Sequence, residues 1–184
     1  VTGSSQGIGL ALAQALASAG AHVIINGRDS AKCERVAAEF AARGEKASVR
    51  AFDVTDYSAT QANIDAIEHD IGAIDILVNN TGIQIRDAFV DFPLADFQRL
   101  IDTNVTSAFA VSQAVTRHMV TRGRGKIINV CSVNSELGRA SIVPYVTSKG
   151  ALKMMTKSMC VELAKQGIQV NGLGPGYFDT ELTQ

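Results

Sequence analysis

Tyr145 and Lys149 stand four residues apart in a helix-forming stretch, so both side chains are predicted to project from one helix face. A free phenol titrates near pH ~10 and is a weak base at neutral pH, but a neighbouring ammonium favours its ionised form. Such a pair could exchange a proton with an alcohol or a carbonyl. Ser132, at the end of a predicted strand, could donate a hydrogen bond to the same oxygen. These residue types predict proton transfer coupled to a hydride-carrying cofactor.

Glycines recur at the start of the chain with the spacing G-x-x-x-G-x-G, over residues 3–9. Where a strand turns sharply into a helix, glycines let backbone N–H groups approach an anion, and a pyrophosphate is the natural ligand there. Similar glycines occur in ordinary tight turns, but here a helix and then a strand follow, as a dinucleotide site requires. The predicted cofactor contacts in this turn are Gly3, Ser5, Gln6, Gly7, Ile8 and Gly9.

The residues around Arg28 bear on which dinucleotide is bound. A strand is predicted to end here, roughly twenty residues after the turn, where this type of fold contacts the adenosine ribose. An NAD site would place a carboxylate at the strand end, whereas Gly27 has no side chain and Arg28 offers donors suited to a 2′-phosphate. NADP is therefore the predicted cofactor and NAD the less favoured one. In the alternative, Arg28 is an exposed loop arginine and Asp29 contacts the ribose.

The order of the elements predicts an α/β fold, because short β-branched runs alternate with apolar residues at helical spacing. Strands are predicted at 21–26, 47–52, 74–79, 126–130 and 168–172. Helices are predicted at 8–19, 30–43, 56–71, 145–165 and 96–122, the last as two helices that break near Thr103 and Asn104. Such alternation predicts a doubly wound parallel sheet with helices on both faces, the three-layer αβα Rossmann arrangement. No linker or repeat intervenes, so residues 1–184 are predicted to form one domain.

The composition argues against several classes of protein. Among 184 residues, 17 basic and 18 acidic side chains give a formal net charge of −1, which leaves no electrostatic footprint for a nucleic acid. No apolar stretch approaches the roughly 20 residues that a bilayer span needs, and no secretory leader is recognised. The three cysteines form no C-x-x-C pair and the histidines lie far apart, so no metal site is predicted. A reducing, cytoplasmic location fits this cysteine usage best.

The order of these motifs is more specific than any one of them. The glycine turn is followed by Asn79-Asn80-Thr81-Gly82, Asn104, Ser132, Tyr145-x-x-x-Lys149 and Pro175-Gly176. That order resembles the short-chain dehydrogenase/reductase family over essentially the whole chain. The resemblance implies a catalytic tetrad of Asn104, Ser132, Tyr145 and Lys149, in which Asn104 holds a water that relays protons from Lys149. Thr81 departs from the family, which usually has alanine at this place.

The resemblance also implies the strand order 3-2-1-4-5-6-7, with one further helix and strand beyond Gln184. Because little of the first strand precedes Gly3, and because that further helix and strand would follow Gln184, the chain is expected to be truncated at both ends. Tyr145 and Lys149 would contact the cofactor, and Lys149 would hydrogen-bond the nicotinamide ribose. The other implied cofactor contacts are Asp53 and Val54 at the adenine, Asn80 and Gly82 along the cofactor, and Pro175, Gly176 and Thr180 near the nicotinamide.

Within the family, residues 82–86 and 128–139, with 113–119 and 175–178, resemble the gluconate 5-dehydrogenases, which interconvert D-gluconate and 5-dehydro-D-gluconate, commonly with NADP. A sugar acid needs a cation for its carboxylate and polar groups for its hydroxyls. The implied substrate contacts are Arg86, Glu136 and Arg139, with Ser132 and Tyr145 at the reacting carbon. Each arginine could instead be a surface residue or a subunit contact.

Other functions stay open at this point. They are another reductase of the family that acts on a ketone, such as a 3-oxoacyl-acyl-carrier-protein reductase, a glucose dehydrogenase, or a non-catalytic NADP-binding sensor. A sensor would have little reason to keep Ser132, Tyr145 and Lys149 together. The family's interface through the helices at 104–121 and 145–165 implies a homotetramer or homodimer, with no nucleic-acid or membrane partner.

Overall fold

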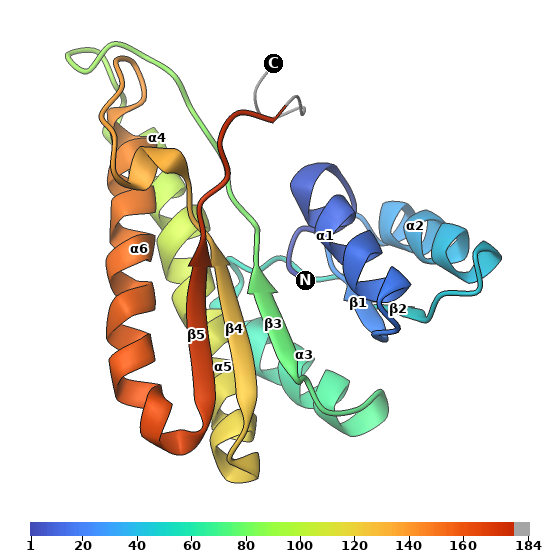
Figure 1. The fold of residues 1–184 in the computed structure, drawn as a ribbon. Coiled ribbons are helices and arrows are strands. Elements are labelled where there is room, and N and C mark those ends of the chain that lie inside the picture. The colour runs from blue at the N-terminus through green and yellow to red at the C-terminus, as the bar shows by residue number, and fades with distance from the viewer. Residues whose placement is uncertain (179–184) are drawn as a thin grey trace.

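A computed structural model describes residues 1–178 of the chain (Figure 1). Helices and strands alternate through most of it. The elements of the first half are α1 (Gly7–Ser18), β1 (Val23–Ile25), α2 (Ser30–Ala42), β2 (Ala47–Val49), α3 (Tyr57–Asp70) and β3 (Ile76–Asn79). Those of the second half are α4 (Leu94–Ile101), a π-helical turn (Asp102–Thr106), α5 (Ser107–Arg122), β4 (Gly125–Val130), α6 (Val143–Leu163) and β5 (Ile168–Leu173), with short 3-10 turns at Val133–Ser135 and Ala164–Gln166.

All strand pairs are parallel, and the first residues of the chain lie between the two groups of strands. β1 pairs with β2, and β3-β4-β5 form a second group in that order. The N–H of Thr2 donates to the carbonyl of Val78 at 2.9 Å, and that of Ser4 donates to the carbonyl of Asn26 at 2.8 Å. The spatial order is therefore β2, β1, residues 1–4, β3, β4, β5. This agrees with the strand order that the family resemblance implies.

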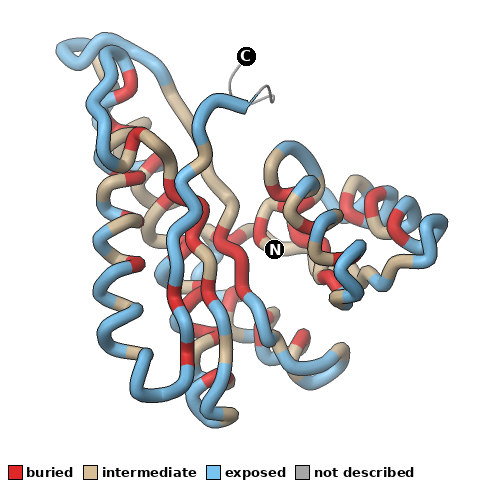
Figure 2. The backbone as a smooth tube through the Cα atoms, in the orientation of Figure 1, coloured by how far each residue is buried: buried red, intermediate tan, exposed pale blue. Residues whose placement is uncertain are grey.

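Two hydrophobic clusters lie on opposite faces of the strands. α1 and α2 pack on β1 around Ile25 and Phe40, whereas α3 and α5 pack on β3, β4 and β5 around Met119 and Ile127. In β1, Val23 and Ile25 join the first cluster while Ile24 contacts the second, as the alternating side chains of a strand require. The buried residues accordingly follow the strands and the inner faces of the helices (Figure 2). The predicted three-layer αβα fold is confirmed.

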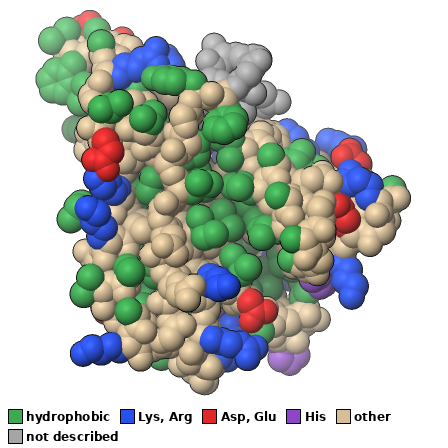
Figure 3. Space-filling view, viewed as in Figure 1, with side chains coloured by type: hydrophobic (Ala, Val, Ile, Leu, Met, Phe, Trp, Pro, Cys, Tyr) green, Lys and Arg blue, Asp and Glu red, His purple; other side chains and the backbone are tan. Residues whose placement is uncertain are grey.

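α3 and α5 lie behind β3, β4 and β5 in Figure 1, and within residues 1–178 no helix covers the face of these strands that is turned toward the viewer. Hydrophobic side chains gather in the middle of this face (Figure 3). Two exposed examples on these strands are Ile76, which is 37% exposed, and Leu173, which is 42% exposed. No helix in the described part of the chain is long and apolar enough to cross a membrane.

The predicted division into two helices near Asn104 is confirmed: α4 ends at Ile101 and α5 begins at Ser107, and the residues between them form a π-helical turn. The turn widens the helix by one residue, and the hydroxyls of Thr103 and Ser107 bond back to carbonyls four residues earlier, at 2.8 and 2.6 Å. Wide turns of this kind are rare and are found at functional sites more often than elsewhere. Here the turn directs Asn104 into the interior, where it is only 1% exposed.

Candidate active site

A cavity of about 1020 Å³ runs along the carboxyl ends of the strands. This is the edge of a doubly wound sheet at which ligands bind. The glycine turn before α1 lines one end and Tyr145 the other, so one ligand could reach both. Cavity residues that were expected to bind the cofactor are Gly3, Ser5, Gln6, Gly7, Ile8, Gly9, Arg28, Asp53, Val54, Asn80, Gly82, Tyr145, Lys149, Pro175 and Gly176. Thr180 lies outside the described residues.

Two glycines of the turn are required by their surroundings. A Cβ on Gly9 would lie 2.2 Å from the carbonyl oxygen of Gly3 and 2.4 Å from Nδ2 of Asn80. Gly3 has a φ of +60°, which disfavours any side chain. The first residues of α1 line the cavity, so the positive end of the helix dipole faces it. No side chain caps the helix at Gln6, and no acidic residue in its first turn offsets that positive end. A pyrophosphate fits this cradle.

The turn is held by Thr2, which the sequence did not single out. Oγ1 of Thr2 accepts from the N–H groups of Asn80 and Thr81, at 3.0 and 3.1 Å. In return, Nδ2 of Asn80 donates to the carbonyls of Thr2 and Gly3, at 3.0 and 3.2 Å. The predicted role of Asn80 as a cofactor contact is therefore joined by a second one, which is to fix the turn. No sequence signal relates two residues that are 78 positions apart.

Two cations stand at the adenosine end of the cavity. Arg28 has a side chain that is 81% exposed, with Nη1 4.0 Å from Oδ2 of Asp53. Lys32, in the first turn of α2, also lines the cavity and donates a hydrogen bond to Gln6. The carboxylate of Asp29 accepts from the backbone N–H of Lys32 at 2.9 Å and so caps α2, as an N-terminal carboxylate often does. Two cations beside a capping carboxylate suit a 2′-phosphate better than a bare ribose. The sequence analysis missed Lys32, because only the tertiary structure shows that the first turn of α2 lines the cavity.

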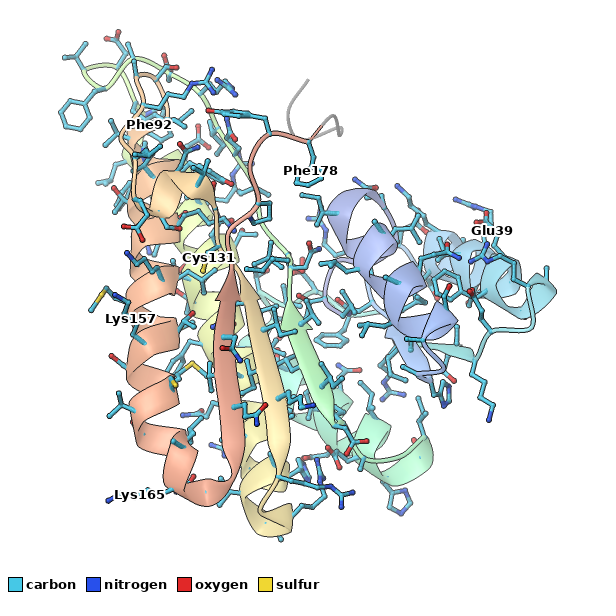
Figure 4. All side chains as sticks on the ribbon, viewed as in Figure 1. Glu39, Phe92, Cys131, Lys157, Lys165 and Phe178 are labelled. Carbon is cyan, nitrogen blue, oxygen red and sulfur yellow. The ribbon has the colours of Figure 1, made fainter. Side chains whose placement is uncertain are left out.

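Ser132, Tyr145 and Lys149 meet at the other end of the cavity. Ser132 follows β4 directly after Cys131, which Figure 4 labels. Its Oγ accepts from the backbone N–H of Asn134 at 3.1 Å, which leaves the hydroxyl proton free to donate to a neighbour. Tyr145 is 8% exposed, and Nζ of Lys149 lies 5.8 Å from the centre of its ring. The helical spacing therefore does place both groups on one face, opposite the serine.

Asn104 completes this cluster from the π-helical turn. Its Oδ1 accepts from the N–H of Ile83 at 2.8 Å, and Nδ2 donates to the carbonyl of Ile83 at 2.9 Å. A Cβ on Gly82 would lie 3.4 Å from Oδ1 of Asn104 and 3.6 Å from Nζ of Lys149. The missing side chain of Gly82 thus leaves a small polar space between these two groups. The family resemblance implies a water, held by Asn104, that relays protons from Lys149, and this space is where such a water would have to lie. The role of Asn104 in holding that water stays a prediction.

Burial controls the proton affinities of the catalytic pair. Burial raises the pKa of Tyr145 above its ordinary value, while a hydrogen bond with Ser132 partly offsets the rise. Burial also lowers the pKa of the Lys149 ammonium to about 8. The sequence led us to expect that the ammonium would make the phenol more acidic. In the structure the loss of hydration is the largest influence on the pKa of Tyr145 and Tyr177 adds to it, so Tyr145 keeps its proton through neutral pH.

The expected substrate contacts are less convergent. Arg86, Glu136 and Arg139 do not line the cavity. Glu136 forms an ion pair with Lys153 on the outside of α6, and Nη1 of Arg139 donates to the hydroxyl of Tyr177. Tyr177 does line the cavity and was not predicted; Phe178, beside it, reaches toward α1 (Figure 4). Of the residues named here, only Tyr177 and Phe178, in the segment after β5, line the cavity.

Known proteins show the same arrangement of elements. The short chain dehydrogenase family matches residues 1–184. The chain belongs to this family. Gluconate 5-dehydrogenase of Gluconobacter oxydans is 52% identical over the whole chain, which covers 72% of that enzyme. The 5-keto-D-gluconate 5-reductase of Escherichia coli is 51% identical, with the same coverage.

A solved structure of the family agrees with the fold in detail. It is a gluconate 5-dehydrogenase from Burkholderia cenocepacia in complex with NADP and tartrate, and it superposes with a TM-score of 0.97. The sequences are 51% identical, and the match covers 100% of this chain and 72% of the other.

Proposed function

We propose that this short-chain dehydrogenase transfers a hydride between NADP(H) and a sugar acid, interconverting D-gluconate and 5-dehydro-D-gluconate. The observation that carries the proposal is the single cavity that connects the glycine turn with Ser132, Tyr145 and Lys149. The names of the relatives support the substrate, and tartrate, bound in one of them, is itself a hydroxy acid. The paired cations Arg28 and Lys32 support NADP.

The residues divide the chemistry between them. The nicotinamide, when bound, supplies or accepts the hydride. Tyr145 donates its proton to the carbonyl oxygen during reduction and takes it back during oxidation. The free hydroxyl proton of Ser132 stabilises negative charge on the same oxygen. The Lys149 ammonium stabilises the phenolate that remains after proton donation.

A substrate panel tests this function. Full-length protein should reduce 5-dehydro-D-gluconate with NADPH at a kcat/KM well above that for an acetoacetyl thioester or for glucono-lactone, and should prefer NADPH to NADH. Preference for the thioester would identify an acyl-chain reductase instead. Oxidation of glucose would identify a glucose dehydrogenase. NADPH binding without turnover of any of these compounds would favour a sensor.

Replacement of Arg28 by alanine should weaken NADPH binding about tenfold, because a charge-assisted contact to the 2′-phosphate is lost at an exposed site. NADH binding should change less than about twofold, since NADH lacks that phosphate. Fluorescence titration with both nucleotides measures the difference. Arg35→Ala, on the exposed side of α2, is the matched control. Equal weakening of both nucleotides by Arg28→Ala would contradict a 2′-phosphate contact.

The rate of ketone reduction should stay level through neutral pH and fall as the pH rises above about 8. Lys149 has a lowered pKa, so its charged form is present below that value and is lost above it, whereas Tyr145 has a raised pKa and keeps its proton longer. Measurement of kcat between about pH 6 and about pH 10 checks this. The fall in kcat at high pH should vanish in Lys149→Met. It should persist in Lys157→Met, because Lys157 lies on the exposed side of the same helix. A fall that survives Lys149→Met would assign it to another group.

Self-association through α5 and α6 is part of the proposal. Phe109 is 52% exposed and Met154 is 58% exposed, and a groove of about 550 Å³ lies between the two helices beside Val120. Phe109→Glu should shift a tetramer or dimer toward smaller species in light scattering. The exposed substitution Lys157→Glu should not. A wild-type monomer would contradict the assembly.

The cytoplasmic location also stays a prediction. Cys33, Cys131 and Cys160 are all unpaired thiols in the structure. Free thiols are the usual state in a reducing compartment.

A further inference from the structure

Ser148 is a fully buried serine in the middle of α6, with an exposed fraction of 0%. It lies between Tyr145 and Lys149 and has no assigned role in the chemistry. A serine at such a place is neither a good helix former nor an apolar filler of the core. Its hydroxyl must therefore be hydrogen-bonded on both sides to offset the cost of burial.

The hydroxyl joins two parts of the active site. Oγ of Ser148 donates to the backbone carbonyl of Tyr145 at 2.7 Å and accepts from Nδ2 of Asn104 at 3.0 Å. Asn104 in turn holds both backbone polar groups of Ile83. One chain of hydrogen bonds thus runs from the loop after β3, through the π-helical turn, to the helical turn that carries Tyr145.

The same helical turn has a polar contact through Lys149 as well as the hydrogen bond between Tyr145 and Ser132. Nζ of Lys149 donates to the carbonyl of Val130 at 2.7 Å. The ammonium of Lys149 has three N–H donors, so it can share them between this carbonyl and ligands in the cavity. The hydroxyl of Ser148 faces only protein groups and can stay in place.

We infer that Ser148 is a positioning residue: its hydroxyl couples Asn104 to the backbone of Tyr145 and so sets the distance of the phenol from Ser132. The inference rests on the proposed function. Without the hydroxyl, Nδ2 of Asn104 loses an acceptor in a buried site, and the turn of Tyr145 loses its link to the loop after β3.

α6 offers a matched control at Thr156. Its buried hydroxyl donates to the carbonyl of Leu152 at 2.7 Å and accepts from Nδ2 of Asn129 at 2.8 Å. Chemically this repeats the contacts of Ser148, two helical turns further on. Asn129 continues to Asn79 on the neighbouring strand, away from the cavity. Thr156→Ala therefore removes an equivalent buried hydroxyl without touching the catalytic turn.

The test compares Ser148→Ala, Asn104→Ala, their double variant and Thr156→Ala in the full chain. Ser148→Ala should lower kcat at least about tenfold with a KM for NADPH within about twofold, while Thr156→Ala leaves kcat nearly unchanged. The double variant should lose no more activity than Asn104→Ala alone, because both residues act through one contact. The ionisation midpoint of Tyr145, taken from ultraviolet titration against Tyr145→Phe, should shift in Ser148→Ala and stay at the wild-type value in Thr156→Ala.

Two results would overturn the positioning role. One is equal loss of activity in Ser148→Ala and Thr156→Ala, and the other is a double variant that loses the product of the two single losses. Absence of any wild-type turnover would instead refute the proposed function. In that event, two other measurements decide the inference. One is the shift of the Tyr145 ionisation midpoint in Ser148→Ala, and the other is the non-additivity of the unfolding free energies of Ser148→Ala and Asn104→Ala in urea.

Discussion

Tyr145→Phe is expected to lower kcat by about 10³-fold in both directions, within the range that a general acid–base group contributes. Phenylalanine keeps the ring, which packs with Leu100 and Ile142, and removes only the hydroxyl that exchanges the proton. NADPH should bind within about twofold of wild type, because the glycine turn and Arg28 are unchanged. Steady-state kinetics and fluorescence titration together measure this separation of chemistry from binding.

Tyr177→Phe is the control for this experiment. Tyr177 is the other tyrosine that lines the cavity, is 68% exposed, and accepts from Arg139. Loss of its hydroxyl should change kcat only a few-fold. A Tyr145→Phe variant that keeps a tenth or more of the wild-type kcat would remove the central assignment.

Gly9→Ala is expected to weaken NADPH binding about 100-fold or more, which corresponds to roughly 2.7 kcal/mol. The added Cβ would meet the carbonyl of Gly3 and the amide of Asn80, both well inside van der Waals contact. Neither group can retreat easily, because backbone bonds hold residues 2–4 to Val78 and Asn26. Overpacking of this kind should also lower the free energy of unfolding by about 1–3 kcal/mol. Fluorescence titration and urea unfolding measure the two effects.

Gly150→Ala provides the matched glycine substitution. Gly150 lies inside α6, and a Cβ there would meet nothing within 4 Å. Its replacement should leave NADPH binding unchanged and raise stability by about 0.5–1 kcal/mol through helix propensity. Wild-type affinity in Gly9→Ala would show that the turn does not hold the cofactor.

Much of the fold and the centre of the site follow from local patterns. A period near 3.6 residues places Tyr145 and Lys149 on one helix face, and buried β-branched runs place Ser132 at the end of a strand. Both rules act within a few residues, so they operate before any tertiary contact is known. The alternation of elements then leaves few possible topologies, because crossovers in parallel sheets are right-handed.

Contacts between distant segments were not accessible in this way. Thr2 fixes Asn80, and Ser148 bonds Asn104, across 78 and 44 residues respectively. Periodicity says which face of an element is buried, but not which side chain of another element it meets. Glu136 shows the same limit, since its neighbours in sequence suggested a substrate contact and packing paired it with Lys153.

By itself, the sequence determined the αβα fold, the glycine turn and the placing of Tyr145 and Lys149 on one helix face. Spacing along a helix or a strand is enough to predict each of these. Only the tertiary structure decided how strongly those groups hold their protons. Burial raises the pKa of Tyr145 and lowers that of Lys149, and burial is a property of everything packed around a side chain rather than of its position in the chain.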